Sequence, residues 1–191
     1  MAETDNEVAA RVKAGDREAY RELVERHSRK LYRLAYRMMG NREDAEDVVQ
    51  ESLLRAFRHI DRFNDEASFR TWLNRIAANY CLDLIRSRKR HAPLGAPDGD
   101  PERPHEFEIA ESRPHPEQLA GARQAYERIE SALEQLTMQE RTAFLLRHCE
   151  GESIPSIAEA LGVNSGAAKH SVFRAVQKLR RVLEPLAGAA L

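Results

Sequence analysis

The sequence predicts an all-α protein of two small helical domains joined by an extended linker, and three observations favour this fold class. Apolar side chains recur three and four residues apart over most of the 191-residue chain, which is the period of an amphipathic helix. No stretch alternates apolar and polar side chains as a half-buried strand does. The helical pattern breaks at residues 92–116, which hold six of the eight prolines, and proline disfavours both helix and strand.

The composition excludes several classes of protein. Charged residues make up 32% of the chain and apolar residues 42%, and no apolar run approaches the length of a membrane span. The first residues are polar and acidic, without the apolar core of a signal peptide. Two cysteines are too few for a disulfide scaffold. We therefore expect a cytoplasmic protein that does not insert into a membrane.

The net charge of −1 conceals an uneven distribution along the chain. Residues 1–91 carry a net charge of +3, residues 92–116 a net charge of −4, and residues 117–191 a net charge of 0. The middle segment is therefore predicted to be an acidic linker between domains at 1–91 and 117–191. Proteins that bind nucleic acid alone usually carry excess positive charge, so DNA binding here is expected to need a partner.

The first domain is predicted to contain four helices. A short helix spans residues 6–14 and stops at Gly15, and Asp16 then caps a second helix that ends at Gly40. The second helix carries one apolar stripe, which consists of Tyr20, Leu23, Val24, Leu31, Leu34, Ala35 and Met38.

The third helix, capped by Asn41, carries a dense group of carboxylates opposite its apolar positions. The group consists of Glu43, Asp44, Glu46, Asp47 and Glu51. Acids in a first turn stabilise the helix dipole, which explains part of the group. Five acids exceed what the dipole needs, so docking of a basic partner is a second interpretation, and both stay open.

A polar loop at residues 61–67 leads to the fourth helix, which begins at Ser68. The apolar stripe of this helix has helical spacing, which favours a core over a platform for stacked bases. The stripe consists of Phe69, Trp72, Leu73, Ile76, Ala77, Tyr80 and Leu84. The helix ends in four cations within five residues. Cations at a helix C-terminus stabilise the helix dipole, which explains part of this cluster. The cluster also predicts a phosphate-binding patch. The four cations are Arg86, Arg88, Lys89 and Arg90.

The second domain opens with an apolar helical face that runs from Leu119 to Leu136. Thr137 followed by Glu140 is a capping box, which predicts the start of the next helix. We expect Pro185 to end the last helix, because proline lacks the amide donor that a helix interior needs.

Two short helices joined by a tight turn follow in this domain. Ser153 caps the first helix, Gly162 supplies the stop, and Asn164 caps the second helix. Residues 163–181 contain five Lys or Arg and no acid. Turn, caps and charge of one sign in this order are typical of a helix-turn-helix that reads DNA. The simpler alternative is a basic, solvated surface helix.

These landmarks resemble the sigma-70 family of bacterial RNA polymerase specificity subunits, in the compact extracytoplasmic-function (ECF) class that has only the second and fourth sigma domains. Three segments carry the resemblance in order: DAEDVVQESLLRAFRHIDRF at 44–63, FRTWLNRIAANYCLDLIRSRKR at 69–90, and residues 133–183 with the helix-turn-helix. The resemblance implies a four-helix sigma region 2 domain at 1–91 and a sigma region 4 domain at 117–191.

The resemblance also implies partners and site residues. Core RNA polymerase would bind through the coiled coil of its largest subunit and its flap, and a cognate anti-sigma factor is compatible with the family. The polymerase-binding residues would be Asp44, Glu46, Asp47, Gln50 and Glu51. The −10 promoter element would be contacted by Asn64, Ser68, Asn79, Arg86, Arg88 and Arg90. The −35 element would be read by Ser165, Lys169, His170, Ser171, Arg174 and Lys178.

Two other functions fit parts of the sequence. A stand-alone helix-turn-helix repressor or activator explains residues 153–181 but neither the acidic third helix nor the basic end of the fourth. An enzyme with a helical metal site is disfavoured, because the one Glu-x-x-His match, Glu102 to His105, lies in the proline-rich segment. We therefore expect no catalytic residues, no metal site and no cofactor.

Overall fold

The computed structural model describes residues 3–64, 66–91, 129 and 131–187, and every regular element in these ranges is helical. The prediction of an all-α protein is therefore confirmed. The proposed linker at 92–116 and the expected start of the second domain, up to residue 128, lie outside the described residues.

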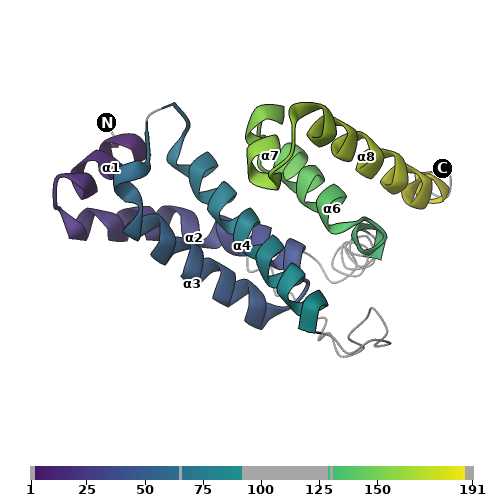
Figure 1. Ribbon diagram of the computed structural model, residues 1–191, viewed down its shortest axis with the longest axis horizontal. Helices are drawn as coiled ribbons and strands as arrows, with labels where there is room; N and C mark the ends of the chain where they lie inside the picture. Colours follow the sequence, from purple (N-terminus) through teal and green to yellow (C-terminus); the bar gives the residue numbers. More distant parts are fainter. Residues whose placement is uncertain (1–2, 65, 92–128, 130, 188–191) are drawn as a thin grey trace, which may run out of the picture.

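The first half of the structure contains four α-helices and one short 3-10 helix (Figure 1). These are α1 (Asp5–Lys13), α2 (Arg17–Met39), α3 (Arg42–Arg58), η1 (Ile60–Arg62) and α4 (Phe69–His91). Helix α2 packs against α1, α3 and α4, and α3 also packs against α4. The four predicted helices are all present, with boundaries within one or two residues of the expected ones.

The helix starts in this half follow the capping rules. The Asp16 carboxylate accepts a hydrogen bond from the Ala19 amide at 3.2 Å, and the Asn41 side chain accepts one from the Asp44 amide at 2.9 Å. Each bond satisfies an amide that has no partner within the helix. Gly40 ends α2 with φ of 77°, a left-handed conformation that a side chain would strain.

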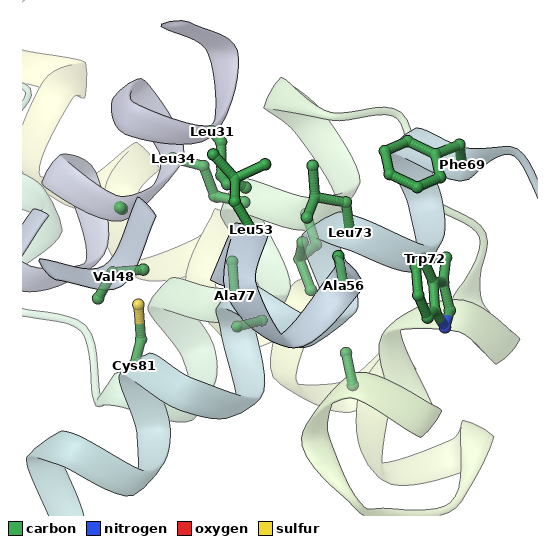
Figure 2. Close-up of a cluster of buried hydrophobic side chains, with 14 of the residues drawn as sticks. Leu31, Leu34, Val48, Leu53, Ala56, Phe69, Trp72, Leu73, Ala77 and Cys81 are labelled. Carbon is green, nitrogen blue, oxygen red and sulfur yellow. The ribbon is translucent and has the colours of Figure 1, made fainter. Parts of the chain in front are cut away.

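The core of the first half lies between α2, α3 and α4 (Figure 2). Phe69 is fully buried, and its ring lies 5.6 Å from the Phe63 ring and 5.8 Å from the Trp72 ring. Such aromatic pairs add about 0.5–1.5 kcal/mol each beyond the burial of apolar area. The predicted interpretation of the aromatic stripe as core is thus confirmed.

The second half continues the helical pattern. Helix α6 (Met138–Phe144) runs directly into a π-helical turn, η2 (Leu145–Cys149), and α7 (Ile154–Leu161) and α8 (Ser165–Ala187) follow. The expected capping box is present, because the Glu140 amide donates to the Thr137 hydroxyl at 3.3 Å and the Glu140 carboxylate accepts from the Thr137 amide at 3.0 Å.

The expected end of the last helix at Pro185 is wrong by two residues. Helix α8 continues to Ala187. A proline removes only its own amide donor and crowds the carbonyl four residues earlier, so a helix that is about to end can accommodate it in its last turn.

The two halves contact each other through α4 and α7, and more weakly through α2 and α6. In Figure 1, α4 runs between the helices of the first half and those of the second half. The hydrophobic core is continuous across this contact, since Leu73 of the first half and Ile157 of the second belong to one buried cluster.

Replacing Phe69 by alanine is expected to lower the free energy of unfolding by about 3–5 kcal/mol, because a fully buried ring leaves a cavity. Replacing Phe173 by alanine removes the same atoms from a side chain that is 57% exposed, and the expected loss is within about 0.5 kcal/mol. Urea unfolding of both variants measures the difference. Equal losses would show that the aromatic cluster is not a core.

Candidate nucleic-acid and protein interfaces

The helix-turn-helix has the backbone that the sequence predicts. The Ser153 hydroxyl accepts from the Ser156 amide at 3.2 Å, and the Asn164 side chain accepts from the Ala167 amide at 2.8 Å. Gly162 has φ of 65°, so the chain turns between α7 and α8 in a left-handed conformation. These contacts fix the angle at which α8 leaves α7.

Four of the six residues predicted to read duplex DNA are exposed on α8. These are Ser165, Lys169, His170 and Arg174. Lys169 and His170 are adjacent and Arg174 follows His170 by four residues, so these three lie within about 140° around the helix at about 100° per residue. We call Lys169, His170 and Arg174, with Ser165 at the start of the helix, the α8 outer face. No acid lies among them, and a cationic helical face of this width suits the major groove.

The other two predicted DNA contacts are turned toward the protein. Ser171 is 9% exposed, and its hydroxyl donates to the Ala167 carbonyl at 3.0 Å. The Lys178 ammonium donates to the Glu140 carboxylate at 2.7 Å. Desolvation is the largest single influence on the Glu140 carboxyl and raises its pKa, but the hydrogen bonds from Lys178 and Thr137 together outweigh it, so the pKa of Glu140 lies below its usual value. The Lys178 pair therefore holds α8 against α6, whereas the Ser171 bond lies within α8.

Phe173 is a feature of the α8 outer face that sequence reasoning missed. It is 57% exposed and lies four residues after Lys169 and three after His170. A single exposed apolar side chain is common on protein surfaces, so Phe173 is singled out by its place among the cations of this face. The sequence could have predicted this exposure. Phe173 lies one helical turn after Lys169, which places it on a different side of α8 from Val172 and Ala175.

The residues predicted to contact the −10 element lie along the loop before α4 and on α4 itself. Asn64, Ser68, Asn79, Arg86 and Arg90 are exposed. The Ser68 hydroxyl accepts from the Thr71 amide at 3.1 Å, so this residue also starts α4. The Asn64 amide donates to the Glu66 carboxylate at 2.9 Å. These side chains span most of the length of α4 and can follow a single strand.

Arg88, the sixth predicted −10 contact, is paired with Asp44, a predicted polymerase contact. The Arg88 guanidinium binds both oxygens of the Asp44 carboxylate, at 2.6 Å for the Nη1–Oδ2 bond. The hydrogen bonds from Arg88 hold the pKa of Asp44 below its usual value, while partial burial opposes them. Asp44 is only 8% exposed, so this pair joins α3 to α4 instead of facing a partner.

The remaining predicted polymerase contacts form a patch on the outside of α3. Glu46, Asp47 and Gln50 are exposed, as is Glu43 beside them. Glu51 is half-buried and its carboxylate accepts from Arg55 at 2.7 Å, while the Arg55 guanidinium lies 4.5 Å from the centre of the Tyr80 ring. We call Glu43, Glu46, Asp47, Gln50 and Leu54 the α3 outer face.

Leu54 is the apolar member of that face and was not predicted. It is 42% exposed and lies four residues after Gln50. A polar rim around an exposed apolar side chain is the usual anatomy of a protein-binding surface. The α3 outer face can therefore offer both charge and apolar contact to a basic partner.

Within the described residues, no three His, Cys, Asp or Glu side chains gather as metal ligands would. None of the helices in that part of the chain is both long and apolar enough to traverse a lipid bilayer.

Comparison with known proteins identifies two family regions in the chain. The model of sigma-70 region 2 matches residues 23–91, and the model of sigma-70 region 4 matches residues 126–179. The ECF RNA polymerase sigma factor SigW of Bacillus subtilis is 33% identical over 92% of this chain and 94% of its own length. SigE of Mycolicibacterium smegmatis, also an ECF sigma factor, is 36% identical over 85% of this chain, which spans 60% of the SigE length.

A solved structure has the same arrangement of helices. CnrH, determined in complex with the cytosolic domain of CnrY, aligns over 96% of this chain and 99% of its own with a TM-score of 0.67 and 27% identity. RpoE of Bartonella quintana, solved with the anti-sigma factor NepR, aligns with the same TM-score at 24% identity and so supports the fold alone.

The Arg88–Asp44 pair is expected to give a pH-dependent contribution to stability. Because the pKa of Asp44 is lower in the folded state, the contribution is present above the unfolded pKa of about 3.9 and is lost as the pH falls through the folded value. Arg88→Gln should therefore destabilise the protein at pH 6–7 and have a smaller effect near pH 3. Urea unfolding across this range measures the change.

Arg86→Gln is the matched control, because Arg86 lies 3.5 Å from Asp83 and both side chains are 64% exposed. Its effect is expected to be small at every pH. The interpretation is wrong if the Arg88 variant loses the same free energy at pH 3 as at pH 7.

Proposed function

The chain belongs to the sigma-70 family, in its ECF class, and we propose that it directs core RNA polymerase to promoters by reading a −35 duplex with α8 and capturing a −10 strand with the first half. The observation that carries this proposal is the separation of two exposed faces of opposite charge. The α3 outer face is acidic, and the α8 outer face is cationic. One suits a basic protein surface and the other suits DNA.

Duplex reading is assigned to the α8 outer face. Lys169, His170 and Arg174 can donate to base edges or phosphates in the major groove, where each base pair shows a distinct pattern of donors and acceptors. Phe173 adds an apolar contact of the kind that recognises the methyl group of thymine. Ser165, at the start of α8, lies where backbone amides can meet a phosphate.

Strand capture is assigned to the loop before α4 and to α4. Asn64, Ser68 and Asn79 carry exposed polar groups that can bond the edge of an unstacked base. Arg86 and Arg90 supply cations for the strand's phosphates, whereas Arg88 orients this end of α4 through Asp44. Removing a base from the duplex costs a few kcal/mol, and these contacts offset that cost.

Attachment to polymerase is assigned to the α3 outer face. Glu46, Asp47 and Gln50 would meet a basic coiled coil, and Leu54 would fill the centre of the contact. Glu51 and Asp44 would act indirectly, because each is bound to an arginine of this chain. Long-range attraction between the two charged surfaces speeds association.

Domain boundaries at 1–91 and 117–191, with a linker at 92–116, accommodate both family regions. Sigma factors are in general initiation factors and not enzymes, and we assign no covalent chemistry to this chain. Its place of action would be the cytoplasm, where the polymerase works. Because the related CnrH was solved with the cytosolic domain of another protein, an inhibitory anti-sigma factor is a further partner that we propose.

A stand-alone helix-turn-helix repressor is not favoured, because it leaves the α3 outer face without a role. In vitro transcription with purified core polymerase on a library of genomic fragments tests the function. Initiation at a defined set of sites is expected only when this protein is added. Tight, sequence-specific binding to duplex DNA without polymerase, and no initiation with it, would favour the repressor.

Reversing charge on the α3 outer face is expected to weaken polymerase binding. Glu46→Lys with Asp47→Lys should raise the dissociation constant for core polymerase roughly tenfold or more, since each 1.4 kcal/mol of lost attraction is a factor of ten. The matched control is Glu18→Lys with Glu25→Lys, which makes the same change on exposed acids of α2. Equal affinities for the two double variants would remove the α3 outer face from the docking surface.

Phe173→Ala is expected to weaken promoter binding by about 5- to 150-fold at sites that carry the recognised thymine, because losing the recognition of one base pair typically costs about 1–3 kcal/mol. Substituting that base pair should cost the wild type more than it costs the variant. Gln139→Ala, on the exposed side of α6, serves as the control. A uniform loss at all upstream sequences would assign Phe173 to the fold of α8 and not to base reading.

A further inference from the structure

His27 is a buried ionisable side chain that the proposed function does not use. It lies on α2, is 6% exposed, and contacts both α1 and the start of α4. Its Nε2 atom lies 2.8 Å from a carboxylate oxygen of Asp5, in the first turn of α1. The centre of its ring lies 5.5 Å from the centre of the Phe69 ring. One ionisable group thus sits where three helices of the first half meet.

The second ring nitrogen of His27 lacks a partner. The Nδ1 atom is buried, and no described residue forms a hydrogen bond with it. A neutral imidazole tolerates this arrangement, because it can donate from Nε2 to Asp5 and leave Nδ1 unprotonated. A protonated imidazole carries a donor on both nitrogens. The structure therefore suits the neutral ring, since a buried donor without an acceptor is unfavourable.

The charges that act on His27 come from α1 and α2. Asp5 of α1 attracts a charged imidazole, whereas Arg26 and Lys30 of α2 repel it. The Arg26 guanidinium also donates to the other oxygen of the Asp5 carboxylate at 2.9 Å, so two groups share that negative charge. From α4 the neighbour is the uncharged Phe69 ring, and an aromatic ring is only a weak acceptor.

These surroundings set the direction in which His27 titrates. Burial lowers the pKa of His27 and outweighs the attraction of Asp5, while Lys30 and Arg26 lower this pKa further. Burial raises the pKa of Asp5, but the hydrogen bonds and charges of Arg26 and His27 outweigh it, so this carboxyl stays ionised near neutral pH. Because the pKa of His27 is lower in the folded state, its packing is most stable above the unfolded value of about 6.5 and weakens as the pH falls.

Helix α1 depends on this junction for its position. Its first turn is held by the Asp5–His27 contact and by Arg26, which also donates to the Glu3 carbonyl at 2.9 Å. Val8, one turn further on, is fully buried. An isolated helix of nine residues is unstable in water, so α1 stays helical only while it is docked. Short elements near a chain end open locally at a smaller cost than the whole domain.

The other end of α1 supports the loop before α4. The ammonium group of Lys13, the last residue of α1, donates to the Phe63 carbonyl and lies 5.3 Å from the centre of the Phe63 ring. Phe63 directly precedes Asn64, and its ring lies 5.6 Å from the Phe69 ring. Both ends of α1 are therefore linked to the segment to which strand capture is assigned.

We propose that His27 is an acid-sensitive positioning residue, whose protonation loosens α1, withdraws its support from the loop before α4 and so weakens capture of the −10 strand in mild acid. The proposal rests on the proposed function. Helix α1 packs chiefly against α2, so the same change should leave the α8 outer face able to read duplex DNA.

Hydrogen exchange of the free protein tests the loosening of α1. Exchange of the α1 amides is compared with that of the α7 amides between about pH 5.5 and 7.5, after correction for the intrinsic pH dependence of exchange. In the wild type, the protection of α1 relative to α7 should fall at least threefold toward the acid end. His27→Gln can still donate to Asp5 but takes up no proton in this range, so its α1 protection should stay constant. Equal pH dependence in the two proteins would overturn the proposal.

Nuclear magnetic resonance of the wild type gives a second measurement that needs no substitution. The ring protons of His27 should titrate below the pH of about 6.5 at which an exposed histidine titrates. The amide signals of α1 and of Asn64 should change along the same curve. Titration of the ring without any change at α1 and Asn64, or titration at or above the ordinary value, would overturn the proposal.

Transcription with core polymerase tests the consequence for strand capture. The ratio of wild-type activity to that of His27→Gln is measured at each pH, which removes the pH dependence of the polymerase itself. This ratio should fall at least twofold between about pH 7.5 and 6. The control is His59→Gln, on an exposed histidine after α3, which should follow the wild type at every pH. A constant ratio would overturn the proposal.

The two levels of the hypothesis fail in different ways. Absence of promoter-specific transcription by the wild type at about pH 7.5 would refute the proposed function. The exchange and resonance measurements use the free protein, so they decide whether His27 controls α1 whatever the outcome with polymerase.

Discussion

Burial of α4 on two opposite sides is the constraint on which the rest of the structure depends. One side closes the core of the first half through Phe69, Trp72 and Leu73. The other side, with Asn74 and Ala78, carries the second half of the molecule. Because α4 packs against both halves, its position in the first half also sets the position of the second half. The placement of the helix-turn-helix therefore depends on α4, which lies outside it.

Charge is organised at the level of single faces and not of the whole chain. The protein is nearly neutral, yet acids gather outside α3 and cations outside α8. Some cations that could bind DNA are instead held by acids of the chain itself, as Arg88 is by Asp44 and Lys178 by Glu140. These internal pairs fix the helices that present the free charges, and their bound acids cannot repel a nucleic acid as strongly as exposed acids would.

Local rules explain what could be predicted from the sequence. Caps and helix stops, such as Asn41, Gly162 and the Thr137–Glu140 box, act between residues that are close in the chain, so a pattern of a few residues is enough. Apolar periodicity likewise located the stripe of α4. The π-helical turn after α6 left no comparable pattern.

Contacts between residues distant in the chain could not be predicted in this way. The sequence marks Asp44 and Arg88 as charged, but nothing in either segment says that they bind each other across 44 residues. The same holds for Asn74, a polar residue on what reads as the solvent side of α4. The sequence therefore identified the polar and charged residues of the candidate interfaces. It did not show which of these side chains face solvent and which, like Ser171, bond within the protein.

The order of packing along the chain has a consequence for biosynthesis. Neighbouring helices pack on one another in the first half, α1 on α2, α2 on α3 and α3 on α4, so this half can fold as soon as it leaves the ribosome. Helix α7, which packs against α4, ends 70 residues after α4, and the ribosome needs about 4–14 s to add these residues at a translation rate of about 5–20 residues per second. During this interval Ala78 and Leu82 lack their cover, and the nascent chain presents an apolar surface that chaperones can recognise.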